Sequence, residues 1–63
     1  MSHHGATFQF FRKNKNLSLV KAAGNIVTPQ FLGRFEKGES DITFSALEKL
    51  LNRMHVSMEE FIH

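Results

Sequence analysis

At the centre of the chain lies Thr28-Pro-Gln-Phe-Leu-Gly-Arg-Phe-Glu-Lys37, a segment typical of a short helix with its own start and stop signals. Thr28 suits the N-cap, where its hydroxyl accepts a hydrogen bond from a first-turn N–H that has no helical partner. Pro29 suits the first helical position, because its missing N–H costs nothing there and its fixed φ fits a helix. Gly38 follows the last turn, where a left-handed residue often ends a helix.

This central helix is expected to have two different sides. Leu32 and Phe35 are three positions apart, so they share an apolar side that faces a core. The other side carries polar or small residues, namely Gln30, Gly33, Arg34 and Lys37. Glutamine and arginine are residues that read base edges, so we expect this side to enter the major groove of DNA.

The composition limits the classes of protein to consider. The chain has 63 residues, 41% of them hydrophobic, and forms one domain at most. It contains no cysteine, which excludes disulfides and a thiolate metal site. No apolar run approaches the roughly 18 residues of a membrane span, and no signal-peptide pattern opens the chain. We therefore expect a cytoplasmic protein without membrane contact.

The charge is divided unequally along the chain. Residues 1–37 carry six basic residues and one acid, a net charge of +5, whereas residues 38–63 carry two basic residues and five acids, a net charge of −3. A basic half is typical of a surface that binds a polyanion. On charge alone, ordinary solvated side chains explain the pattern equally well.

Residues 1–5 are expected to form a flexible tail, and residues 6–63 the folded domain. The tail contains His3 and His4. Two adjacent histidines are too few ligands for a metal site, and the other two histidines lie far away in the sequence. We expect neither a metal nor another cofactor.

Two helices are expected before the central one. The first covers residues 6–14, where Phe8 and Phe11 share a face. The second covers residues 19–24 behind Ser18, a natural N-cap, and its paired alanines let another helix approach closely. A Gly-Asn turn then leads towards the central helix. Two short helices joined in this way have the anatomy of a helix-turn-helix.

Two further helices are expected after the central one. Thr43 caps a helix over residues 44–54, whose apolar residues repeat at the three- and four-residue steps of a core-facing stripe. Ser57 and Glu60 form a capping box that opens a last turn. The chain shows no strand pattern and no internal repeat. The expected fold class is therefore all-α, with five short helices.

Particular residues strengthen this interpretation. The pattern is carried by Leu17, Ser18, Ala22, Ala23, Val27, Thr28, Leu32, Phe35, Glu36, Gly38, Leu47, Leu50, Val56 and Phe61. Over about residues 5–62 the chain resembles the phage-repressor-like (Xre) helix-turn-helix domain. The run Phe31-Leu-Gly-Arg-Phe-Glu-Lys-Gly-Glu-Ser-Asp-Ile42 and the ending Glu59-Glu60-Phe61 resemble the Rgg/MutR type of transcriptional regulator more closely.

The resemblance implies a five-helix bundle that binds operator DNA within a homodimer. In full-length Rgg/MutR regulators, a C-terminal helical repeat domain binds a short pheromone peptide, and this chain stops where that domain would begin. The resemblance also implies a largely buried structural ion pair between Arg12 and Glu36. Gly33 departs from the family, which usually has a polar residue there, so one DNA contact is expected to be missing.

Specific roles follow for the exposed residues. Gln30 suits adenine and Arg34 suits guanine, while Pro29 offers an apolar edge to a thymine methyl. Phosphate contacts are expected from Ser18, Lys21, Thr28 and Lys37. The alternative for Gln30 and Arg34 is an ordinary solvated helix face.

Other functions are weighed against DNA binding. An enzyme is not expected, because the chain has no cysteine nucleophile, no Gly-rich phosphate loop and no carboxylate pair near a histidine. The main alternative is a protein-interaction or dimerisation module, such as a small antitoxin-like helical domain. Candidates for its exposed apolar patch are Phe44, Leu51, Met58 and Ile62.

Overall fold

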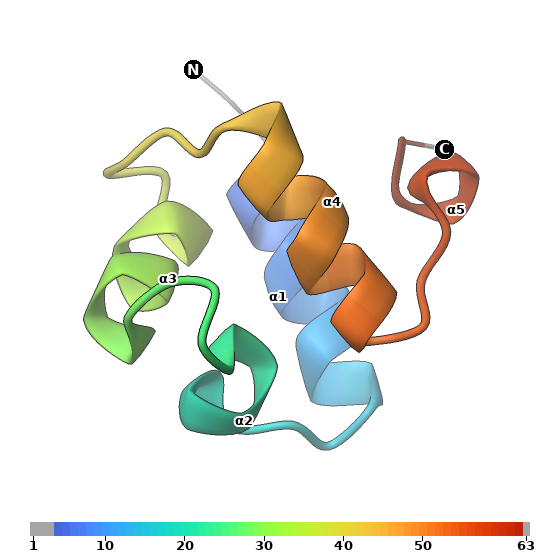
Figure 1. Cartoon of the computed structure of the whole chain (residues 1–63), viewed down its shortest axis with the longest axis horizontal. Helices are drawn as coiled ribbons and strands as arrows, with labels where there is room; N and C mark the ends of the chain where they lie inside the picture. Colours follow the sequence, from blue (N-terminus) through green and yellow to red (C-terminus); the bar gives the residue numbers. More distant parts are fainter. Residues whose placement is uncertain (1–3, 63) are drawn as a thin grey trace.

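The computed structural model describes residues 4–62 and confirms an all-α fold of five helices (Figure 1). In chain order they are α1 (His4–Asn14), α2 (Leu19–Ala23), α3 (Pro29–Glu36), α4 (Phe44–Arg53) and α5 (Met58–Ile62). In Figure 1, α3 and α2 lie to one side of α1 and α4, and α5 lies to the other. None of the described helices is both long and apolar enough to cross a membrane.

The helix starts follow the capping signals of the sequence. Ser18, Thr28 and Thr43 are all in the extended conformation, and each hydroxyl accepts a hydrogen bond from the backbone N–H three residues later. At α5, Ser57 and Glu60 exchange side chain–backbone hydrogen bonds of 3.1 Å in a complete capping box. These bonds satisfy N–H groups that the first turn of a helix leaves without partners.

The core lies where α1, α3 and α4 meet. Its largest fully buried side chains are Phe8, Leu32, Leu50, Leu51 and Met54. Phe8 meets Phe35 edge to face, with ring centroids 6.0 Å apart. Ala22 and Ala23 of α2 are also fully buried. Their small side chains allow α2 to approach the core closely, as expected from the sequence.

The first helix begins earlier than expected. His4 and Gly5, which the sequence analysis placed in a tail, belong to α1, and Gly5 is buried. A Cβ atom on Gly5 would lie 2.0 Å from the carbonyl oxygen of Phe35, so the start of α1 touches the backbone at the end of α3. Glycine is required by this approach. His3 and the rest of the expected tail lie outside the described residues.

The other helix ends differ from expectation by one residue. The second helix ends at Ala23 instead of Gly24, α3 at Glu36 instead of Lys37, and α4 at Arg53 instead of Met54. Gly38 has a φ of +80°, the left-handed conformation expected after α3. Within residues 4–62, no three His, Asp or Glu side chains gather to hold a metal ion.

Candidate nucleic-acid interface

The polar side of α3 faces outward from the bundle. Gln30 and Arg34 are exposed and stand one helical turn apart on this side. Lys37, just after the helix, is exposed as well. The opposite side buries Leu32 and Phe35. The helix therefore rests on the core by its apolar side and displays glutamine, arginine and lysine along a single stripe.

Gly33 does not belong to this stripe. It is half-buried, and a Cβ atom built on it would have the Leu19 side chain of α2 as its near neighbour, at 3.6 Å. The sequence analysis grouped Gly33 with the exposed residues and inferred a missing DNA contact. That inference was wrong, because the position is directed at α2 and belongs to the packing of α2 on α3.

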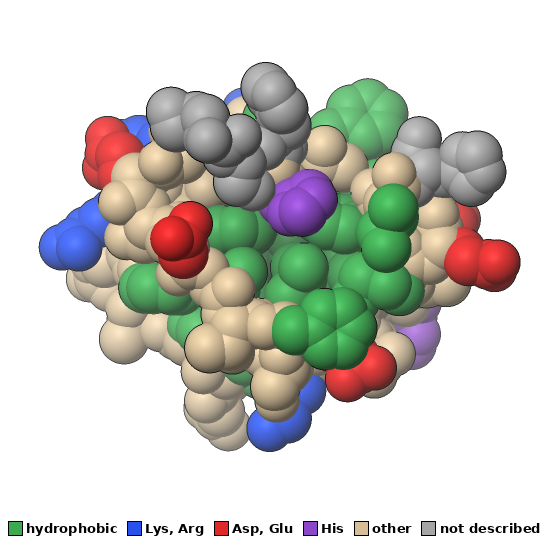
Figure 2. Space-filling view, turned by 90° about the horizontal axis from the view of Figure 1, so that it is seen from above, with side chains coloured by type: hydrophobic (Ala, Val, Ile, Leu, Met, Phe, Trp, Pro, Cys, Tyr) green, Lys and Arg blue, Asp and Glu red, His purple; other side chains and the backbone are tan. Residues whose placement is uncertain are grey.

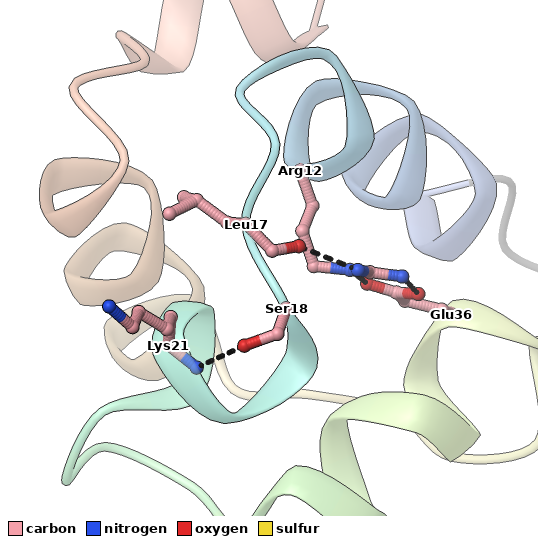
Figure 3. Close-up of polar contacts among 5 residues, drawn as sticks. All are labelled: Arg12, Leu17, Ser18, Lys21 and Glu36. Carbon is pink, nitrogen blue, oxygen red and sulfur yellow. Dashed lines mark hydrogen bonds and ion pairs between the residues drawn. The ribbon is translucent and has the colours of Figure 1, made fainter.

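Two hydroxyl groups lie at the helix starts beside the stripe. The Oγ of Ser18 accepts the backbone N–H of Lys21 at 3.1 Å (Figure 3), and Oγ1 of Thr28 accepts the N–H of Phe31 at 3.0 Å. Both residues are exposed, as is Lys21. A hydroxyl that accepts a hydrogen bond retains its own O–H donor. Each cap can therefore still donate a hydrogen bond to an anionic oxygen outside the protein.

A buried ion pair holds α1 against α3. The Nε of Arg12 donates to Oε2 of Glu36 at 2.6 Å, and its Nη2 donates to Oε1 at 2.9 Å, a two-pronged arrangement. The two residues expose only 9% and 7% of their surface. The hydrogen bond with Glu36 raises the pKa of the Arg12 guanidinium, against the opposing effect of burial.

The same guanidinium reaches a third segment. Its Nη1 donates to the carbonyl oxygen of Leu17 at 2.8 Å (Figure 3). Leu17 directly precedes Ser18, the N-cap of α2. Arg12 therefore fixes the start of α2 relative to the end of α3, and so sets the geometry of the two helices that carry the exposed polar residues.

Arg53 secures the other end of α2. Its Nε donates to the backbone carbonyl of Lys21 at 2.8 Å. Gly24, with a φ of +55°, leaves room for this contact, because a Cβ there would lie 2.7 Å from the same Nε. The sequence analysis missed Arg53. No local signal marks it, since its partner is 32 positions away.

The α2–α3 unit has a cationic outer surface. Residues 17–38 contain one acid, Glu36, and its charge is buried against Arg12. The three basic residues of this segment, Lys21, Arg34 and Lys37, are all exposed. Buried neutralisation of the acid leaves the cations without a competing carboxylate from this segment. Such a surface favours a polyanionic partner.

Comparison with known protein families agrees with this geometry. Residues 9–61 match the model of a helix-turn-helix family. No solved structure matches the chain significantly. The family match spans most of the chain and includes every helix. The protein therefore belongs to the Xre-type helix-turn-helix family, a family of DNA-binding proteins without enzymatic activity.

Proposed function

We propose that the protein regulates transcription by placing α3 in the major groove of a specific DNA sequence. The observation that carries this proposal is the outward stripe of Gln30 and Arg34 on a helix held rigidly by buried contacts. Side chains near the start of a recognition helix reach base edges. Gln30 bonds adenine, Arg34 bonds guanine N7 and O6, and Pro29 touches a thymine methyl.

Phosphate contacts set the position of the helix on the duplex. Ser18 and Thr28 donate their hydroxyl hydrogens to phosphate oxygens, while Lys21 and Lys37 supply the positive charge. Support comes from the exposure of all four residues and from the cap bonds, which leave both hydroxyl donors available. These contacts fix the register of the complex without reading its sequence.

The test begins with selection of a preferred site from random duplex DNA, followed by fluorescence anisotropy at several salt concentrations. Arg34→Ala should lower affinity for the selected site and relax the preference at one base pair, by about 1–3 kcal/mol. Lys37→Ala should weaken all duplexes alike and reduce the steepness of the salt dependence by about 0.9 per phosphate lost. Lys49→Ala, an exposed lysine on α4, is the control. The proposal fails if Arg34→Ala changes neither affinity nor base preference.

We further propose that the domain acts in an Rgg/MutR-type regulator, a homodimer whose C-terminal domain binds a peptide pheromone. Residues 31–42 and the ending Glu59-Glu60-Phe61 support this assignment. A dimer places two recognition helices about 34 Å apart on one face of the duplex. An open reading frame without a helical repeat domain after His63 would contradict the assignment, and tight sequence-specific binding by a proven monomer would contradict the dimer.

A further inference from the structure

A second face of the molecule is apolar. Phe44, at the start of α4, and Ile62, at the end of α5, expose 64% and 68% of their surface. A hollow of about 280 Å³ lies between them, lined by His4, Phe44, Leu47, Met58, Phe61 and Ile62. Figure 2 shows hydrophobic side chains gathered around a histidine on this face. We refer to these six residues as the α4–α5 hollow. Leu51, which the sequence analysis also placed in an exposed patch, is 1% exposed and belongs to the core.

The floor of the hollow is rigid. Leu47 and Phe61 are buried core residues. Phe61 contacts two rings of α1, with centroids 5.6 Å from His4 and 6.4 Å from Phe11. Scattered exposed hydrophobic residues are ordinary, but several that surround one hollow mark an interaction site. A site with a floor already held in place loses little entropy when it binds.

Carboxylates flank the apolar residues. Glu48 follows Phe44 by one helical turn, and Glu59 precedes Ile62 by three positions, so each shares a helix face with its apolar neighbour. Both are exposed, and within residues 4–62 neither forms a salt bridge. Arg53, one of the two basic residues of this half, is bonded to α2. Figure 2 shows acidic side chains at the border of the hydrophobic surface.

We propose that the α4–α5 hollow binds an amphipathic helix of a partner protein, with apolar side chains at helical spacing flanked by lysine or arginine. A hydrophobic groove accepts the apolar face of such a helix. The flanking carboxylates attract its basic residues and repel acidic ones. Because α5 lies on the other side of α1 and α4 from α3 (Figure 1), the partner leaves the DNA-binding stripe free.

A second copy of this chain fits the surface less well. A two-fold contact joins the same patch on both copies. It would therefore bring Glu48 and Glu59 of each copy to one interface, where like charges oppose association. The free carboxylates favour a basic partner over self-association.

The probe is a synthetic helical peptide of leucine and lysine, with leucines at i, i+3, i+4 and i+7. Titrated into ¹⁵N-labelled protein, it should shift the amide signals of Phe44, Leu47, Met58 and Ile62 and leave those of Gln30 and Arg34 unchanged. Two control peptides, one with the same composition scrambled and one with glutamate for lysine, should bind at least about tenfold more weakly. These peptides test the proposal without altering the protein.

Protein variants test the residues themselves. Phe44→Ser should weaken peptide binding about tenfold or more, because it removes an apolar anchor. Phe10→Ser is the matched control, since Phe10 is 62% exposed on α1 and does not line the hollow. The charge reversal Glu48→Lys with Glu59→Lys should also weaken binding. A thermal melt of each variant verifies folding.

Three results would overturn the proposal. The first is equal affinity for the scrambled peptide, and the second is signal shifts confined to α2 and α3. The third is a concentration-dependent dimer in analytical ultracentrifugation that Phe44→Ser dissolves and that the peptide displaces. That last result would make a second copy the occupant of the hollow.

Discussion

Removing Glu36 should unfold a large part of the population of this small domain at moderate temperature. Glu36→Ala leaves the Arg12 guanidinium without both short hydrogen bonds to the carboxylate, at 2.6 and 2.9 Å. The bond to the Leu17 carbonyl is then its remaining described partner. The side chains of the pair expose 10% and 2% of their surface, so water reaches the stranded charge poorly.

The expected cost follows from that burial. Breaking a buried ion pair by removing one partner costs about 3–5 kcal/mol. A chain of this length has a total stability of only about 3–9 kcal/mol. The midpoint of thermal unfolding falls by about 4–8 °C per kcal/mol in domains of this size, so Glu36→Ala should lower it by at least about 12 °C. Circular dichroism melts and urea titrations measure both quantities.

Controls separate the ion pair from general effects of substitution. Glu48→Ala removes an exposed carboxylate of a helix and should stay within about 0.5 kcal/mol of the parent. The double variant Arg12→Met, Glu36→Leu replaces both charges by apolar groups and should recover most of the loss, since such replacements are often neutral or stabilising. A loss below about 1 kcal/mol for Glu36→Ala would refute the reasoning, because a truly desolvated guanidinium cannot lose its partner so cheaply.

Three other substitutions have definite expected outcomes. Gly33→Ala should raise the free energy of unfolding by up to about 1 kcal/mol in urea titrations, because alanine favours the helix and its Cβ meets only ordinary contact at 3.6 Å. Gly5→Ala should lower it by about 1–3 kcal/mol, because its Cβ would collide with the Phe35 carbonyl 2.0 Å away and the helices must separate. Thr43→Ala should cost about 1 kcal/mol through loss of the cap on α4, without altering DNA affinity beyond that explained by stability. A neutral Gly5→Ala would show that α1 and α3 do not approach as closely as described.

The two faces of the molecule divide its proposed work. The α2–α3 side is cationic because its single acid is buried against Arg12, and the α4–α5 side is apolar with free carboxylates around it. One guanidinium thus affects both stability and charge, since its loss would release a carboxylate near the DNA-binding stripe. Variants of Arg12 should accordingly be tested for folding before any DNA measurement is interpreted.

The local pattern of residues determined the helices. Each start depends on a hydroxyl and an N–H three residues apart, and each buried stripe depends on steps of three or four positions, so both can be read without knowing the fold. The placement of Gln30 and Arg34 on the outside of α3 followed from the same periodicity. The pairing of Arg12 with Glu36 came from the family resemblance and not from spacing.

Tertiary structure decided the features that join residues distant in sequence. The burial of Gly5, the anchoring of α2 by Arg53, the inward direction of Gly33 and the separation of buried Leu51 from exposed Phe44 all depend on how whole helices pack. Local rules cannot reach these contacts, because capping and periodicity describe a helix relative to its own axis. Which part of that helix meets a neighbour is settled only when the core closes around Phe8, Leu32 and Leu50.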